Sequence, residues 1–467
     1  MGRASREFSP RIGVVYSLDS KTVVRGGWGI YVSPWNYSAA GTTGWSQYGY
    51  SATTTLQQSS SGVPITSLSD PFPGAFVQPT GNSLGLLTNV GQSTTISLPN
   101  KGTPKAQQYS VDLQREMRGG VMIGIGYTGL TGSDLPYQTN ININQLDPKY
   151  QLLVANTLVS VPNPFYGIAD AGGFASRQTI ELGQLLRPFP QFGDILWSGA
   201  TGARSQYHAL ILQGRKRTDN LWGLNVSYTF SRLMDNQVGA SNYYSSSPGL
   251  QNNYVLVPWS EYYDPDAEYS RSLLDSPHKL TISPTLLLPF GTGKKWLANS
   301  GWGNAVLGGW SVTTVAQFQS GFPVGVSQNV SGTTFLFGGT LRPNLVEGQP
   351  ILADGDITDR ISANPTDNQY FNLAAFQAVA LNQFGNAPRT LPGVLSPFRT
   401  SFSMSAAKNV DLPGRAALSL RLELLNPLNI VQWAAPASSA LGNSSFGQLR
   451  EQANNMRSVQ FTLRLSY

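Results

Sequence analysis

The 467-residue sequence predicts an all-β protein, an antiparallel transmembrane β-barrel, and three observations support this. Apolar and polar side chains alternate in about eleven segments, and the links between these segments alternate between short and long. Charged residues make up only 12% of the chain, about half the usual share. No apolar run approaches the roughly 18 residues that a membrane-spanning helix requires.

The alternation predicts each strand in turn. In 223–231, for example, Leu224, Val226 and Tyr228 lie on one face and polar residues lie on the other. Most of the segments are close to the roughly 9 to 11 residues of a tilted membrane strand. The predicted strands are 11–17, 22–32, 108–116, 121–129, 207–216, 223–231, 278–288, 310–318, 400–408, 417–425 and 458–467.

The links between these strands differ greatly in length. Four are short: one near Asp19, and 117–120, 217–223 and 411–416. The link 289–309 is intermediate and is predicted to hold one helical turn. The remaining links are roughly 33–104, 131–204, 233–275, 320–398 and 427–456. Outer-membrane barrels have short periplasmic turns and long extracellular loops, so this pattern predicts that setting and outer-membrane lipid as a partner.

A soluble β-sandwich is the alternative fold, because its strands also alternate. A compact soluble domain rarely carries even one structureless loop beyond about 15 residues. Aromatic residues near the strand ends also favour the barrel, since such residues gather at membrane interfaces. They are Tyr16, Trp28, Tyr31, Tyr127, Tyr228, Phe230, Trp310, Phe318 and Tyr467.

The number of strands predicts that this barrel is partial. The last strand follows a long link, so counting back makes the first strand run in the same direction, from outside to periplasm. A single-chain bacterial barrel normally has an even number of strands. We therefore expect an open, curved half-shell in which 11–17 and 458–467 are separate, unpaired edges.

The residue types give little support for an enzyme. The chain has only two histidines, His208 and His278, and no cysteine. We find no G-x-S-x-G motif, and "GTGKK" at 291–295 lacks the spacing of a phosphate-binding loop. The basic residues are scattered, whereas a nucleic-acid binder concentrates them on one face. We expect no catalysis, no cofactor and no nucleic-acid partner.

The long loops contain candidate ligand-binding residues. Aromatic rings beside amides suit glycans or other amphipathic ligands, although the same rings could instead pack the loops together. Two acidic clusters, Asp264, Asp266 and Glu268 and then Asp354, Asp356 and Asp359, lack the spacing of an EF-hand, so we interpret them as solvated loops rather than calcium sites. The candidate aromatics are Trp35, Tyr37, Trp45, Tyr48, Tyr50, Tyr243, Tyr244, Tyr254, Trp259, Tyr262 and Tyr263.

Segments along nearly the whole chain resemble one known family. They include "FSPRIGVVYSLDSKTVVRGGWGIY", "QQYSVDLQREMRGGVMIGIGYTGLTGSDL", "LRPFPQFGDI", "SQYHALILQGRKRTDNLWGLNVSYTFSRLMDN", "DSPHKLTISPTLLLPFGTGKKW", "LGGWSVTTVAQFQSGFPVGV" and "FGQLREQANNMRSVQFTLRLSY". In this order they resemble the TonB-dependent-receptor-like outer-membrane proteins of the Oar type. The resemblance implies a parent barrel of twenty-two strands, of which this chain is the C-terminal half. It also implies a signal peptide, a carboxypeptidase-regulatory-like domain and a plug, none of which this chain shows.

The resemblance also implies partners and a function. The alternating residues Val459, Phe461, Leu463, Leu465 and Tyr467 resemble the signal read by the barrel assembly machinery. By resemblance, the protein is a transporter for a scarce nutrient, such as a glycan or another large ligand. The TonB complex would act only through the missing N-terminal region. The alternative is a structural or adhesion protein that acts through its large surface loops.

Overall fold

The computed structural model describes residues 8–33, 48–54, 69–70, 72, 76–96, 102–137, 141–147, 149–150, 157–197, 199–219, 221–236, 263–291, 293–297, 301–329, 341–355, 367–380, 384–412 and 416–467. Every strand predicted from the alternation is present. The strands are β1 (Arg11–Ser17), β2 (Thr22–Val32), β4 (Lys105–Met117), β5 (Val121–Pro136), β10 (Thr201–Lys216), β11 (Trp222–Asp235), β13 (His278–Leu287), β14 (Trp310–Gln319), β18 (Arg399–Asp411), β19 (Ala417–Leu425) and β21 (Ser458–Ser466).

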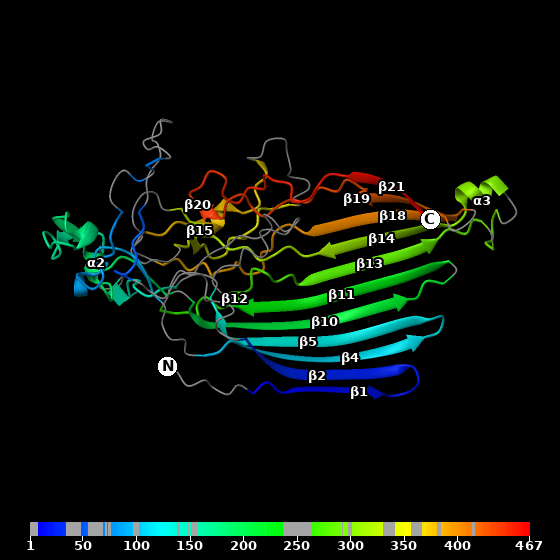
Figure 1. The fold of residues 1–467 in the computed structure, drawn as a ribbon, viewed down its shortest axis with the longest axis horizontal. Coiled ribbons are helices and arrows are strands. Elements are labelled where there is room, and N and C mark those ends of the chain that lie inside the picture. Colours follow the sequence, from blue (N-terminus) through cyan, green and yellow to red (C-terminus); the bar gives the residue numbers. More distant parts are fainter. Residues whose placement is uncertain are drawn as a thin grey trace.

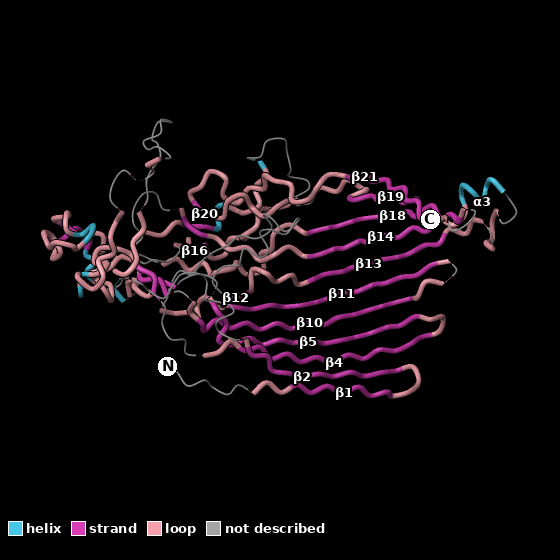
Figure 2. Tube along the Cα trace, in the orientation of Figure 1, coloured by secondary structure: helices cyan, strands magenta, loops and turns pink. Residues whose placement is uncertain are grey.

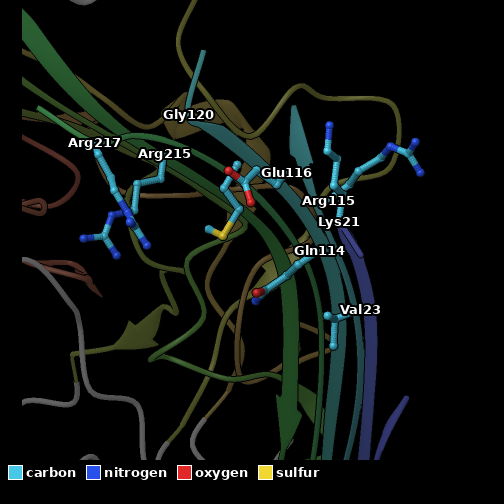
Figure 3. A pocket seen from close by; sticks show the side chains of 9 residues that line it. Lys21, Val23, Gln114, Arg115, Glu116, Gly120, Arg215 and Arg217 are labelled. Carbon is cyan, nitrogen blue, oxygen red and sulfur yellow. The ribbon is translucent and has the colours of Figure 1, made fainter. Parts of the chain in front are cut away.

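These strands form one antiparallel sheet in chain order, from β1 at one edge to β21 at the other, and the short β12 (Ser270–Arg271) pairs with β11. Within the described ranges β1 pairs with β2 alone and β21 with β19 alone, so the sheet is open. Figure 1 shows these two strands at opposite edges, and the strands bend into a curved wall in the close view of Figure 3. The expectation of an open, curved sheet is confirmed.

The register gives the sheet two chemically distinct faces. Residues that pair across antiparallel strands project to the same side. Leu422 lies opposite Ala406 and Phe461, and this apolar face continues from strand to strand as far as Ile12, which lies opposite Trp28. The other face is polar: Glu423 lies opposite Ser405 and Gln460. We call these the apolar face and the polar face.

A row of rings crosses the apolar face. Tyr127 stacks on His208 with ring centroids 6.1 Å apart, and its hydroxyl lies 2.7 Å from His208 Nδ1. Tyr228 and His278 repeat this arrangement at 6.2 Å and 2.8 Å. Both histidines are thus part of an aromatic belt. Tyr31 is not, because the register places it on the polar face beneath the Arg11 guanidinium; assigning it to an interface belt was wrong.

Short turns join the strands at one end of the sheet. In the β10–β11 turn, Asp219 Oδ1 accepts hydrogen bonds from the Leu221 and Trp222 amides at 2.8 and 3.0 Å, and its carboxylate pairs with Lys216. The β13–β14 link contains the predicted helical turn, α3 (Gly301–Leu307). Among the described residues, no helix is long and apolar enough to cross a membrane.

Five long loops lie at the other end of the sheet, where Figure 2 shows the loop segments gathered opposite α3. We call them L1 (β2–β4), L2 (β5–β10), L3 (β11–β13), L4 (β14–β18) and L5 (β19–β21). They contain secondary structure of their own, in elements of two to four residues. These are η2 (Gly85–Leu87), β3 (Thr94–Ile96), β6 (Ile141–Asn142), β7 (Ser160–Pro162), η3 (Gly172–Phe174), β8 (Thr179–Glu181), α2 (Leu182–Leu185), β9 (Ile195–Trp197), β15 (Ser327–Gln328), β16 (Asn344–Leu345), η5 (Leu373–Ala375), β17 (Phe376–Gln377) and β20 (Ala440–Leu441).

Candidate functional site

The five loops are joined to one another in a layer at this end of the sheet (Figure 2). L1 and L2 share the small sheet β3-β9-β6. L2 meets L3 where the Tyr263 hydroxyl donates to the Gln145 carbonyl at 3.0 Å. L4 and L5 share the β15–β20 pair and a buried core of Val324, Val326, Phe371, Ala375, Phe376, Ala387, Leu391, Val394 and Phe446. The described part of the loop layer is therefore packed rather than loosely solvated.

Buried ion pairs connect L4 to L3 and to the end of β11. Arg342 lies 2.5 Å from the Glu268 carboxylate, and both side chains are almost fully buried. Arg389 donates to the Glu268 carbonyl at 2.9 Å and pairs with the Asp235 carboxylate at 2.5 Å. Burial lowers the pKa of Arg342, and the charge of Glu268 opposes that shift. These pairs fix the position of L4 over the ends of β11 and β12.

The acidic cluster of L3 is divided between two environments. Glu268 is 1% exposed, so interpreting that residue as part of a solvated acidic loop was wrong. Asp264 Oδ1 accepts from the amides of Asp266 and Ala267, and Asp266 pairs with Arg204 at 2.8 Å. Of the three residues in the L4 acidic cluster, Asp354 is described, whereas Asp356 and Asp359 lie outside the described residues. Within the part of the chain that the structure describes, no group of carboxylates or histidines could hold a metal ion.

Most of the predicted aromatic candidates lie outside the described residues: Trp35, Tyr37, Trp45, Tyr243, Tyr244, Tyr254, Trp259 and Tyr262. Tyr48 is half-buried and Tyr50 is exposed, both in L1. Tyr263 joins L2 to L3 through its hydroxyl, and its ring is partly exposed. For Tyr263, this contact is an example of the alternative prediction, in which the aromatic residues pack the loops together instead of binding a ligand.

A basic cavity of about 220 Å³ lies at the short-turn end of the sheet, along β2, β4, β5 and β10. Figure 3 shows Arg215 and Arg217 on one side of it and Lys21 and Arg115 on the other, with Glu116 between them. Arg115 also contacts Asp19 at 3.4 Å. Arg215 and Arg217 are the members of this group that can attract a carboxylate or phosphate group.

The C-terminal strand lies where the sequence predicts. Val459, Phe461, Leu463 and Leu465 project from the apolar face of β21, and Tyr467 follows the end of the strand. All five side chains are at least 58% exposed. They form one outer edge of the apolar face.

Sequence reasoning missed the buried pairs and the cavity. Arg389 and Asp235 lie 154 residues apart in the chain, so no local pattern connects them. The basic segment 214–217 can be read from the sequence, but only the strand register shows that Arg215 and Arg217 line the same cavity as Lys21 and Arg115. A count of basic residues near the predicted short turns is the sequence signal that could have indicated this cavity.

The comparison with protein families agrees with this architecture. The model of the outer membrane beta barrel domain matches residues 2–460. The chain belongs to that family, and it lies in the outer membrane with its apolar face toward lipid. By the arrangement usual in such barrels, the short turns are periplasmic and the loop layer is extracellular. No curated protein matches the sequence.

Several solved outer-membrane proteins share low similarity with the chain. The outer membrane transporter YddB from Escherichia coli is 10% identical, with a TM-score of 0.43, over 98% of this chain and 40% of that one. The ferripyoverdine receptor of Pseudomonas aeruginosa is 8% identical (TM-score 0.39, 98% and 32%), and the FrpB iron transporter of Neisseria meningitidis is 9% identical (TM-score 0.36, 98% and 37%). The chain thus spans two fifths or less of the length of these three structures.

Proposed function

We propose that this chain forms part of the wall of a TonB-dependent receptor of the Oar type, and that the complete protein takes up a scarce nutrient. One observation carries the proposal: a lipid-facing sheet whose polar face leads to a packed layer of extracellular loops. A polar wall suits a water-filled or plugged interior, and the ordered loops suit ligand capture. A glycan or another large ligand fits the aromatic content of the loops.

The proposal includes segments beyond this sequence. Further strands would pair with β1 and β21, because an unpaired strand edge costs several kcal/mol per backbone group in lipid. A plug would occupy the interior, and TonB would act only through that upstream region. The barrel assembly machinery would recognise Val459, Phe461, Leu463, Leu465 and Tyr467 on the last strand.

Uptake measurements test this function. Cells with and without the gene would receive fluorescently labelled oligosaccharides, with and without a protonophore. We expect uptake that depends on the gene and stops when the protonophore removes the energy for TonB. Gene-dependent uptake that continues with the protonophore would contradict energised transport.

An adhesion or structural role is the second candidate, favoured by the buried ion pairs and the shared core that pack the described loops together. Its signature would be loss of cell aggregation in the gene deletion while uptake of every oligosaccharide stays unchanged. That result would replace the transport proposal.

A further inference from the structure

A lysine lies on the apolar face of the sheet. The register places Lys408 of β18 opposite Trp310 of β14 and Leu420 of β19, and both neighbours face lipid. A lysine on this face costs roughly 2–4 kcal/mol at the midplane and roughly 0–1 near the interfaces. Lys408 is only 5% exposed, so it is covered by another part of the protein.

The end of α3 covers the Lys408 ammonium. Lys408 Nζ lies 2.6 Å from the Ala305 carbonyl oxygen and 3.4 Å from those of Asn304 and Val306. Carbonyls in the last turn of a helix lack partners within the helix, and a cation there is favourable. The Trp310 indole donates to the Val306 carbonyl at 2.9 Å from the same face. Lys408 and Trp310 therefore hold the end of the helix from the lipid side of the sheet, and Figure 1 shows α3 just beyond the strand ends, at the short-turn end.

The exposed side chains of α3 are apolar. Trp302 is 78% exposed, Val306 57% and Leu307 47%, and Trp296 in the preceding link is half exposed. Lys295 places its ammonium 5.4 Å from the Trp296 ring centre. Aromatic and aliphatic side chains with lysine beside them are typical of segments that lie in a membrane interface.

We propose that α3, with Trp296, is an interfacial anchor that inserts Trp302, Val306 and Leu307 into the periplasmic leaflet of the outer membrane. The phospholipid bilayer is the partner, because the end of α3 is held by Trp310 of β14 and Lys408 of β18, which both project from the lipid-facing side of the sheet. Lys408 acts as the latch that holds the helix against the sheet. The anchor fixes the depth of this side of the sheet, and it requires neither ligand nor energy from TonB.

Spin labels test the anchor, and the absence of cysteine from this sequence makes single-site labelling simple. Trp302→Cys and Val306→Cys would be labelled in protein reconstituted into phosphatidylethanolamine and phosphatidylglycerol vesicles. The matched control is Ser20→Cys, an exposed position in the β1–β2 turn at the same end of the sheet. Collision with oxygen, which concentrates in lipid, is compared with collision with a water-soluble nickel chelate.

We expect both α3 labels to collide several-fold more with oxygen than with the nickel chelate, and the Ser20 label to show the reverse preference. Two results would overturn the anchor. One is collision of the α3 labels with nickel as frequent as at position 20. The other is shielding from both reagents, which would indicate a protein partner instead of lipid.

The latch has its own test. Lys408→Met removes the cation but keeps an apolar side chain, so the sheet should still assemble while the label at position 302 becomes more mobile. Trp310→Phe, which removes only the indole donor to Val306, gives the same readout if the Lys408 variant fails to fold. Unchanged mobility in the folded variant would disprove the latch.

Discussion

The cost of a single substitution in this sheet depends on the face that carries it. Leu422 lies near the middle of β19 on the apolar face, whereas Ser419 projects from the polar face. Leu422→Arg should cost about 2–4 kcal/mol in the free energy of unfolding if residue 422 lies at the membrane midplane, and Ser419→Arg far less. Denaturant titration in lipid vesicles measures both. Equal costs would show that the faces are assigned wrongly.

Two glycines on the apolar face offer a matched pair. A Cβ at Gly129 would overlap the ring of Tyr109, whereas a Cβ at Gly214 would meet no atom within 4 Å. Gly129→Ala should cost about 1–3 kcal/mol, because the Tyr109 ring, whose centroid lies 6.3 Å from that of Tyr127 in the belt, must move. Gly214→Ala should be neutral or stabilising by up to about 1 kcal/mol, since glycine weakens a strand. The same denaturant titration measures both variants. If Gly129→Ala leaves the free energy of unfolding unchanged, Tyr109 moves without cost and the prediction is wrong.

Among the elements, the strands were predictable and the loop layer was not. The strand segments alternate over seven or more residues, which is a local signal, and the structure contains each of them. The loop strands have only two or three residues, too few for any period to show. The Glu268–Arg342 and Asp235–Arg389 pairs join segments that are distant in sequence, so only the folded structure brings these residues together. Tyr31 was assigned to the belt for another reason, its place near the end of a strand. That place does not show which face of the sheet the side chain projects from, and the register does.

The buried pairs of the loop layer should be far more important than exposed pairs on the sheet. Arg389→Met leaves the Asp235 carboxylate buried without its partner, which should cost about 3–5 kcal/mol. The control, Arg421→Met, removes a largely exposed partner of Glu423 and should cost at most about 1 kcal/mol. Limited proteolysis on whole cells should show faster cleavage of L3 and L4 for Arg389→Met alone. Equal cleavage in both variants would contradict the role of the network.

The β10–β11 turn should respond to pH through Asp219. Its hydrogen bonds with Lys216 and with the Trp222 and Leu221 amides hold the pKa of Asp219 well below its usual value. Because the folded pKa is lowered, the stabilisation is present above the unfolded pKa of about 3.9 and is lost as pH falls through the folded pKa. The gap in unfolding free energy between wild type and Asp219→Ala should therefore shrink below about pH 4. A gap that stays constant from neutral pH to pH 2 would refute this.

At the scale of the whole molecule, one sheet has lipid on one side and water on the other. Its apolar face carries the aromatic belt and Lys408, which binds the end of α3, while its polar face lies on the side away from lipid. The protein should therefore sediment with outer membranes and resist extraction by carbonate, and folded monodisperse protein without detergent would contradict this. The open edges at β1 and β21 are where the proposed further strands would pair.

Cysteine scanning of β19 tests the central claim, that the two faces of this sheet meet lipid and water respectively. Single cysteines at positions 418 to 424 would react with a small charged thiol reagent in isolated outer membranes. We predict that the reagent modifies cysteines at 419, 421 and 423. Cysteines at 418, 420, 422 and 424 should stay protected until denaturant unfolds the sheet. Uniform reactivity along the strand, or alternation in the opposite phase, would contradict the account.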